Sequence, residues 1–159
     1  MKRAFGLMLA VMLALVLTAC EDSSGEQPRN FATGDVQNLV EAGVFSEELE
    51  ELDADVAFAL YRLGDCGLSR EDLMEAAVVR SAGATCEEAA VLLFVDEKAA
   101  ERAEQAMEDY LEGQIESNIN YRPDEIPKLE NAILEKRAEG MVLVVAHDTE
   151  KAGEVLELN

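Results

Sequence analysis

Val91-Leu92-Leu93-Phe94-Val95-Asp96-Glu97-Lys98-Ala99 decides the fold that this sequence predicts. Its first five residues are apolar, which is typical of a strand buried on both faces. Asp96 then stands where a helix needs an N-cap. The same order returns in Val142-Leu143-Val144-Val145-Ala146-His147-Asp148-Thr149-Glu150-Lys151-Ala152. The repetition predicts a strand-strand-helix unit that occurs twice.

This repeat predicts an α+β fold with a four-stranded antiparallel sheet and both helices of the repeat on one face. Since the inner strands are apolar throughout, the other face must be covered too, either by N-terminal helices or by a partner protein. The predicted strands cover residues 75–80, 89–95, 131–136 and 141–146, and the predicted helices cover 35–42, 53–63, 97–119 and a segment after Asp148.

The first twenty residues have the layout of an export signal. Lys2 and Arg3 precede an apolar run, residues 4–18. As a helix this run is about 22 Å long, which is short for a bilayer core of about 30 Å. Leu17-Thr18-Ala19-Cys20 resembles the bacterial lipobox. That resemblance implies cleavage after residue 19 and diacylglycerol on Cys20, so that two acyl chains anchor the protein. The alternative is an ordinary signal peptide in which Cys20 has no role.

We therefore expect a signal peptide over residues 1–19, a lipidated flexible tether over 20–34 and a single domain over 35–159. The domain is expected on the extracytoplasmic face of the cell membrane. Loss of Lys2 and Arg3 lowers the formal charge by two, from −21 to −23. Such an acidic chain is a poor ligand for nucleic acid and for anionic lipid. A cationic partner, a divalent ion or solubility alone is compatible with it.

Two cysteines remain in the domain, Cys66 and Cys86. Export permits a disulfide between them, but an intervening strand favours two unpaired, buried thiols, and there is no CxxC motif. His147 is the sole histidine, and beside Asp148 it could act as a general base; a simple strand-end residue is the favoured interpretation. One histidine and two distant cysteines do not make a zinc site, so neither a metal nor a cofactor is expected.

The predicted helix over 97–119 separates an apolar from an acidic face. Carboxylates four residues apart repel each other by about 0.2–0.5 kcal/mol per pair, so either a cation or basic partner compensates them or the face is simply solvated. Arg122, in Tyr121-Arg122-Pro123, either grips an anionic ligand or marks the end of the helix. The candidate cation-binding or interaction face consists of Glu97, Glu101, Glu104, Glu108 and Glu112.

Four segments stand out together: Ala84-Thr85-Cys86-Glu87-Glu88-Ala89-Ala90-Val91, Tyr121-Arg122-Pro123-Asp124-Glu125, Leu129-Glu130-Asn131-Ala132 and the apolar strand over 141–146. In these segments the chain resembles a family of bacterial lipoprotein domains known as domain of unknown function 4358 (DUF4358). The motifs in these segments mark turns and the ends of helices and strands, and they carry no catalytic pattern. The resemblance implies a lipid-anchored extracytoplasmic domain and brings no known activity, cofactor or catalytic residue.

The sequence contains no phosphate loop, nucleophile elbow or metal motif. We therefore expect a non-enzymatic domain that binds a cell-envelope protein, a peptide or a wall component, and no nucleic acid. One alternative is an accessory solute-binding lipoprotein of a transporter, which needs a pocket with convergent polar groups. A further alternative is a hydrolase with two buried carboxylates whose pKa values are raised.

Overall fold

The computed structural model describes residues 28–158. Within them, five strands form one antiparallel sheet in the order β1-β2-β3-β5-β4. The strands are β1 Glu50–Leu52, β2 Leu73–Arg80, β3 Glu88–Phe94, β4 Ile133–Arg137 and β5 Gly140–Val145. The helices are α1 Gly34–Ala42, α2 Ala54–Leu60, α3 Glu97–Asn118, α4 Ile126–Glu130 and α5 Thr149–Val155, with short 3₁₀ turns at η1 Leu63–Cys66, η2 Arg70–Asp72 and η3 Pro123–Glu125. The predicted α+β class is confirmed.

The two apolar strands of the repeat lie side by side at the centre of the sheet. β3 and β5 are antiparallel, and Val91 of β3 stands opposite Val142 of β5. All of β5, and β3 except for Leu93, is buried. The side chains of alternate residues therefore pack into two separate hydrophobic cores, one on each face of the sheet, as the continuous apolar runs predict.

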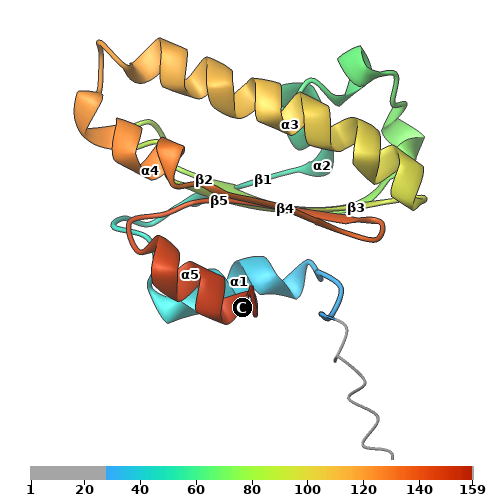
Figure 1. Cartoon of the computed structure of the whole chain (residues 1–159), viewed down its shortest axis with the longest axis horizontal. Helices are drawn as coiled ribbons and strands as arrows, with labels where there is room; N and C mark the ends of the chain where they lie inside the picture. Colours follow the sequence, from blue (N-terminus) through green and yellow to red (C-terminus); the bar gives the residue numbers. More distant parts are fainter. Residues whose placement is uncertain (1–27, 159) are drawn as a thin grey trace, which may run out of the picture.

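Helices cover both faces of the sheet (Figure 1). One face carries α2, α3 and α4, and the other carries α1 and α5. On the first face Met107 of α3 packs with Leu92 and Leu143 of the sheet. On the second face Leu39 of α1 and Leu156 pack with Val91. Both N-terminal helices form, but only α1 covers the second face.

The prediction of four strands is wrong, because β1 adds a fifth at the edge of the sheet. β1 pairs with β2 through Glu50↔Arg80, Glu51↔Val79 and Leu52↔Val78. Its sequence, Glu-Glu-Leu, is short and acidic and lacks the β-branched and aromatic residues that mark a strand. Tertiary pairing with β2 imposes the strand.

The expectation that both repeat helices share one face is also wrong, since α3 and α5 lie on opposite faces. Phe94 and Val145 both belong to the core beneath α3. Asp96 caps α3 two residues after Phe94, whereas Asp148 caps α5 three residues after Val145. The additional residue, Ala146, is buried in the opposite core. Because side chains of an extended chain alternate between faces, one extra residue redirects the chain to the other face.

The packed domain begins before residue 35, the boundary that the sequence predicts. Phe31 is buried, and the Arg137 guanidinium lies 4.6 Å from the centre of its ring. Arg29 Nη1 is 2.9 Å from an oxygen of the buried Asp35. Arg137 also donates to the carbonyls of Arg29 and Glu157, each at 2.9 Å. The segment from Arg29 is therefore held against the domain, so residues 29–34 do not belong to a flexible tether.

The predicted signal peptide, residues 1–19, and the lipidation site Cys20 lie outside the described residues. Within residues 28–158, no helix is both long enough and apolar enough to cross a bilayer.

Candidate functional site

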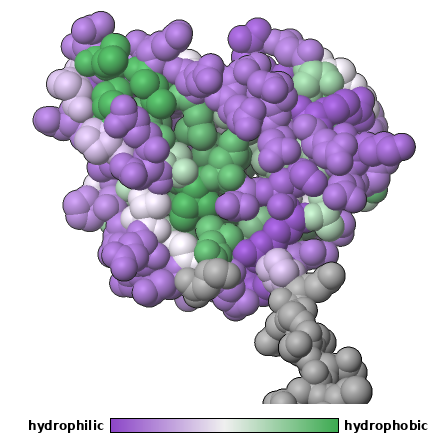
Figure 2. Space-filling model, in the orientation of Figure 1, coloured by the Kyte–Doolittle hydropathy of each residue, from purple (hydrophilic) through white to green (hydrophobic). Residues whose placement is uncertain are grey.

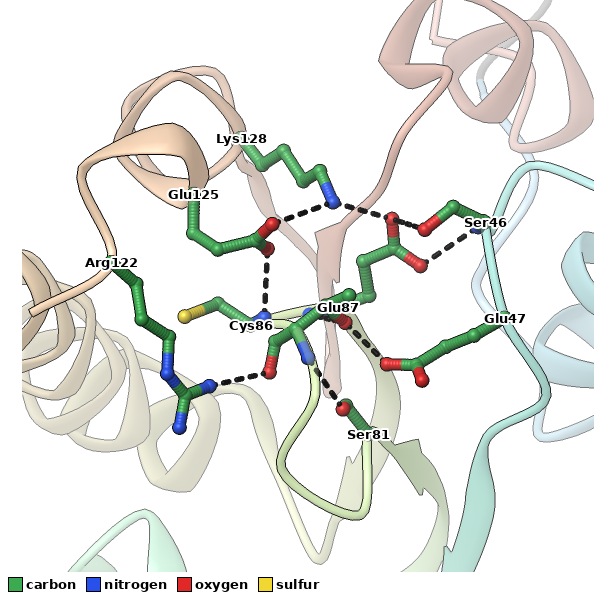
Figure 3. A network of polar contacts seen from close by, with 9 residues as sticks. Ser46, Glu47, Ser81, Cys86, Glu87, Arg122, Glu125 and Lys128 are labelled. Carbon is green, nitrogen blue, oxygen red and sulfur yellow. Dashed lines mark hydrogen bonds and ion pairs between the residues drawn. The ribbon is translucent and has the colours of Figure 1, made fainter.

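A fully buried carboxylate, Glu87, lies at the centre of a polar network at one end of the sheet (Figure 3). Ser46 donates to it twice, from its backbone N–H at 2.8 Å and from its hydroxyl at 2.7 Å. Lys128 Nζ lies 2.8 Å from Glu87 Oε1. The network thus joins the loop after α1, the start of β3 and α4.

Glu125 and Arg122 hold the same stretch of backbone from the other side. A Glu125 oxygen accepts the Cys86 N–H at 2.9 Å, and its second oxygen is 3.1 Å from Lys128 Nζ. Arg122 Nη1 donates to the Thr85 carbonyl at 3.1 Å. Thr85, Cys86 and Glu87 are therefore each bound by a side chain from the segment that follows α3. Figure 3 shows the contacts to Cys86 and Glu87.

The local sequence explains why these three side chains converge. Arg122, Glu125 and Lys128 are spaced by three residues. Pro123 opens the 3₁₀ turn η3, and α4 follows directly. In helical turns, residues three apart lie on the same side. The spacing therefore directs a cation, a carboxylate and a second cation at the start of β3.

A second polar cluster surrounds Glu88, the next residue of β3. Tyr110 donates to Glu88 Oε2 at 2.7 Å, and Arg80 Nε is 3.2 Å from the same oxygen. Tyr61 donates to Oε1 at 3.4 Å, and the two tyrosine rings meet edge to face at 5.0 Å. Burial raises the pKa of Glu88 despite these hydrogen bonds. Burial and the neighbouring carboxylate also raise the pKa values of Tyr61 and Tyr110.

The reactive side chains of the Glu87 network are held in their protonated forms. Burial raises the pKa of the Cys86 thiol, and the Glu125 carboxylate raises it further. Burial by itself would lower the pKa of Lys128, but hydrogen bonds and ion pairs with Glu87 and Glu125 outweigh it, so the pKa is raised. Across residues 28–158 every buried side-chain nitrogen or oxygen has a hydrogen-bond partner. At neutral pH the network therefore presents neither a thiolate nor a free amine.

A separate cleft of about 520 Å³ lies between helix α3 and the 3₁₀ turn η1. Donors and acceptors converge on it from Arg62 and Asp65 on one wall and from Gln105, Asp109 and Gln114 on the other. Gly113 of α3 also lines the cleft, and a Cβ built there meets nothing within 4 Å. The glycine therefore leaves space in the cleft wall.

The two cysteines of the domain do not form a disulfide with each other. Both Cys66 and Cys86 are free thiols. Cys66 lines the cleft, donates to the Leu63 carbonyl at 2.9 Å and has its pKa raised by burial. Cys86 belongs to the Glu87 network. The sequence favours two unpaired, buried thiols; both are unpaired in the structure, but each is only partly buried.

His147 is exposed at the end of β5 and lines a shallow hollow with Lys128, Asn131 and Asp148. The Asp148 side chain accepts from the Lys151 N–H and so caps α5, as predicted. Neither a serine nor a cysteine lines this hollow. Among the described residues, groups of histidine, cysteine and carboxylates that could hold a metal ion are absent.

The predicted acidic face follows the outer side of α3. Ala99, Ala103, Ala106 and Met107 are buried on the inner side, as the periodicity predicts. Glu97 has a cation nearby, Lys136 Nζ at 3.3 Å. The remaining members of the face, Glu101, Glu104, Glu108 and Glu112, form no ion pair with a described residue.

Sequence reasoning singled out Arg122 and Cys86 but missed Ser46, Glu87, Glu125 and Lys128 as one network. A signal exists, since Arg122, Glu125 and Lys128 alternate in charge at a spacing of three. Ser46 carries no such signal, because a loop of the chain brings it to Glu87 across 41 residues.

The segments that form the network also carry the family likeness. Thr85 to Glu88 and Arg122 to Glu125 lie within residues 67–147, which match the family described as Domain of unknown function (DUF4358). Comparisons with curated proteins and with solved structures give no match. The matched segment runs from Gly67, at the end of η1, to His147, at the end of β5, and includes strands β2 to β5 and helix α3. Because this is more than half of the sequence, the chain belongs to the DUF4358 family.

Proposed function

We propose that this chain is a lipid-anchored, extracytoplasmic domain that binds a component of the cell envelope and has no catalytic activity of its own. The lipobox at Leu17-Thr18-Ala19-Cys20 supports the anchor. The acidic composition supports a cationic partner over nucleic acid or an anionic membrane surface. A cell-envelope protein or a wall component is the class of ligand that this location offers.

One observation carries the non-catalytic part of the proposal. The partly buried Lys128 ammonium is held by Glu87 and Glu125, and the raised pKa values of Cys86 and Lys128 keep both groups protonated. A thiol or amine that acts as a nucleophile or base needs the opposite shift, a lowered pKa. The arrangement supports a structural role, in which the network fixes the loop before β3 to α4.

Buried carboxylates are present, as a hydrolase would require, but they are enclosed. Glu87 is bound by Ser46 and Lys128, and Glu88 by two tyrosines and Arg80. Neither glutamate lines the cleft beside α3 or the hollow beside His147. A substrate therefore has no access to a pair of carboxylates through these two openings, which counts against glycoside hydrolysis.

Cross-linking in intact cells tests this function. A membrane-impermeant amine-reactive reagent should join the full chain to another envelope component, and the adduct should stay in the membrane fraction. The Cys20→Ala variant should lose both the membrane location and the adduct. An unmodified chain in the membrane fraction after cross-linking at saturating reagent would contradict the proposal.

The cleft beside α3 favours a second candidate, an accessory solute-binding lipoprotein. Its volume of about 520 Å³ falls in the range of small-molecule sites, roughly 300–1,000 Å³. Polar groups converge on it from two elements, as that function requires. A panel of envelope solutes, screened by the shift of the thermal unfolding midpoint, distinguishes this candidate from partner binding.

A further inference from the structure

The outer edge of the sheet beside α3 is open. Among the residues that the structure describes, β4 is the last strand of the sheet and pairs with β5 alone. Alternate backbone N–H and C=O groups of such a strand point away from the sheet and can pair with another extended chain. Five residues, Ile133–Arg137, provide this edge.

An apolar groove of about 430 Å³ lies beside the start of this edge, where Leu129, Ala132 and, from β4, Leu134 face α3. Leu111 and Ile115 of α3 face Ala132 and Leu134 across it, and all four are only partly buried. Figure 2 shows the corresponding apolar strip, which descends from the C-terminal end of α3 toward α5 between hydrophilic surfaces. An apolar strip of this kind on a chain of such high charge marks an interaction surface.

Carboxylates surround the groove. Glu108 and Glu112 of α3 lie along one wall, and Glu130 lies at the end of α4. None of the three forms an ion pair or a side-chain hydrogen bond with a residue in the described part of the chain. A ligand for this groove therefore needs apolar groups for the floor and positive charge for the rim. A second copy of this acidic chain is poorly suited, because like charges repel.

We propose that the groove between α3 and β4 binds an extended, basic segment of a partner protein, which adds a strand to the sheet at β4. Backbone hydrogen bonds to β4 hold the segment, its apolar side chains fill the floor, and its lysine or arginine side chains reach Glu108 and Glu112. Long basic side chains suit this position because their apolar stems cover the groove while their charges stay in water. This inference rests on the proposed function and specifies its partner.

Peptide titration against the full chain, purified in detergent, tests the proposal. The probe is a fluorescent peptide, capped at both ends, in which valine and lysine take turns at every second position with threonine between them, so that both kinds of side chain lie on one face of the strand. Its reference has glutamate in place of lysine. The lysine peptide should bind and the glutamate peptide should not. Glu108→Gln with Glu112→Gln should weaken binding at least about tenfold. Glu101→Gln with Glu104→Gln removes the same charge from α3 outside the groove and should weaken it far less.

Three outcomes of the titration would overturn the proposal. One is no binding of the lysine peptide; another is equal weakening by both double variants, which would show attraction to the net charge alone. The third is undiminished binding of a peptide with proline in place of every valine and threonine, because most of the N–H groups that could pair with β4 are then gone. A sedimentation measurement that finds a dimer blocking the edge would also overturn it. Failure here leaves the adduct in the membrane fraction unchanged, so it is distinct from failure of the proposed function.

Discussion

Lys128 is the residue that neutralises the Glu87 network. Its ammonium lies between a fully buried carboxylate, Glu87, and the mostly buried Glu125. Removal of one partner from a buried ion pair leaves an uncompensated charge, which costs more than the pair contributes. The stability of the whole sheet end therefore depends on this side chain, although it lies on a five-residue helix.

Lys128→Met should lower the free energy of unfolding by about 3 kcal/mol or more. Addition of Glu87→Gln should restore part of that loss, since the orphaned charge is then gone. Lys136→Met is the matched control, because Lys136 pairs with an exposed carboxylate, Glu97, and should change stability by less than about 1 kcal/mol. Urea unfolding measures all three variants. Similar losses for Lys128→Met and Lys136→Met would contradict this account of the network.

Glu88 should affect stability in a pH-dependent way. Burial raises its pKa above the ordinary value of 4.5. A carboxyl with a raised pKa contributes stability that is fully present below pH 4.5 and is lost as the pH rises through its folded pKa. Glu88→Gln mimics the protonated acid, so the advantage of the wild type over this variant should shrink between acidic and neutral pH. Urea midpoints of the wild type and of Glu88→Gln at a series of pH values measure this difference in stability. If the advantage of the wild type grew with pH, burial would not be the dominant cause of the raised pKa.

At the scale of elements, caps and apolar periodicity could be predicted from the sequence. Asp96 and Asp148 each cap a helix, as expected. Asp53, near which the second helix is predicted to begin, caps α2, and Gly43 ends α1 in the left-handed conformation with φ of 70°. These signals are local, so the neighbouring residues are enough to recognise them. Helix α3 accordingly begins where predicted and ends within one residue of the prediction.

The features that the sequence did not predict are those that long-range contacts decide. β1 exists because β2 offers it an edge, and the side chosen by α5 depends on the single additional residue Ala146. The Glu87 network joins Ser46 to Lys128 across the fold, and its members look like ordinary surface residues in the sequence. The cleft beside α3 likewise depends on where η1 packs, and no spacing within α3 predicts that.

A glycine in helix α3, Gly113, lines the cleft and allows a test of solute binding there. Gly153 in helix α5 lies outside the cleft and is the control. A Cβ at Gly113 or Gly153 would meet no atom within 4 Å, so alanine at either should stabilise the protein by about 0.5–1 kcal/mol. Gly113→Leu should in addition fill the cleft and abolish any solute-induced shift of the unfolding midpoint, whereas Gly153→Leu should not. Thermal unfolding with and without the solute measures both effects. An unchanged shift in Gly113→Leu would exclude the cleft as the solute site.

At the scale of the whole molecule, the two faces of the sheet have different surroundings. Residue 28, where the described chain begins, and the C-terminal end lie on the side of α1 and α5 (Figure 1). The cleft and the apolar groove lie on the other side of the sheet, beside α3. In a protein tethered through its N-terminus, this arrangement leaves the α3 side free for a partner.

Metabolic labelling with radioactive palmitate tests the anchor, on which the proposed location and partner both depend. The full chain should incorporate label and sediment with membranes. Cys20→Ala should abolish incorporation, while Cys66→Ala and Cys86→Ala, which remove thiols of the folded domain, should keep it. An unlabelled full chain, or label that persists in Cys20→Ala, would contradict the account.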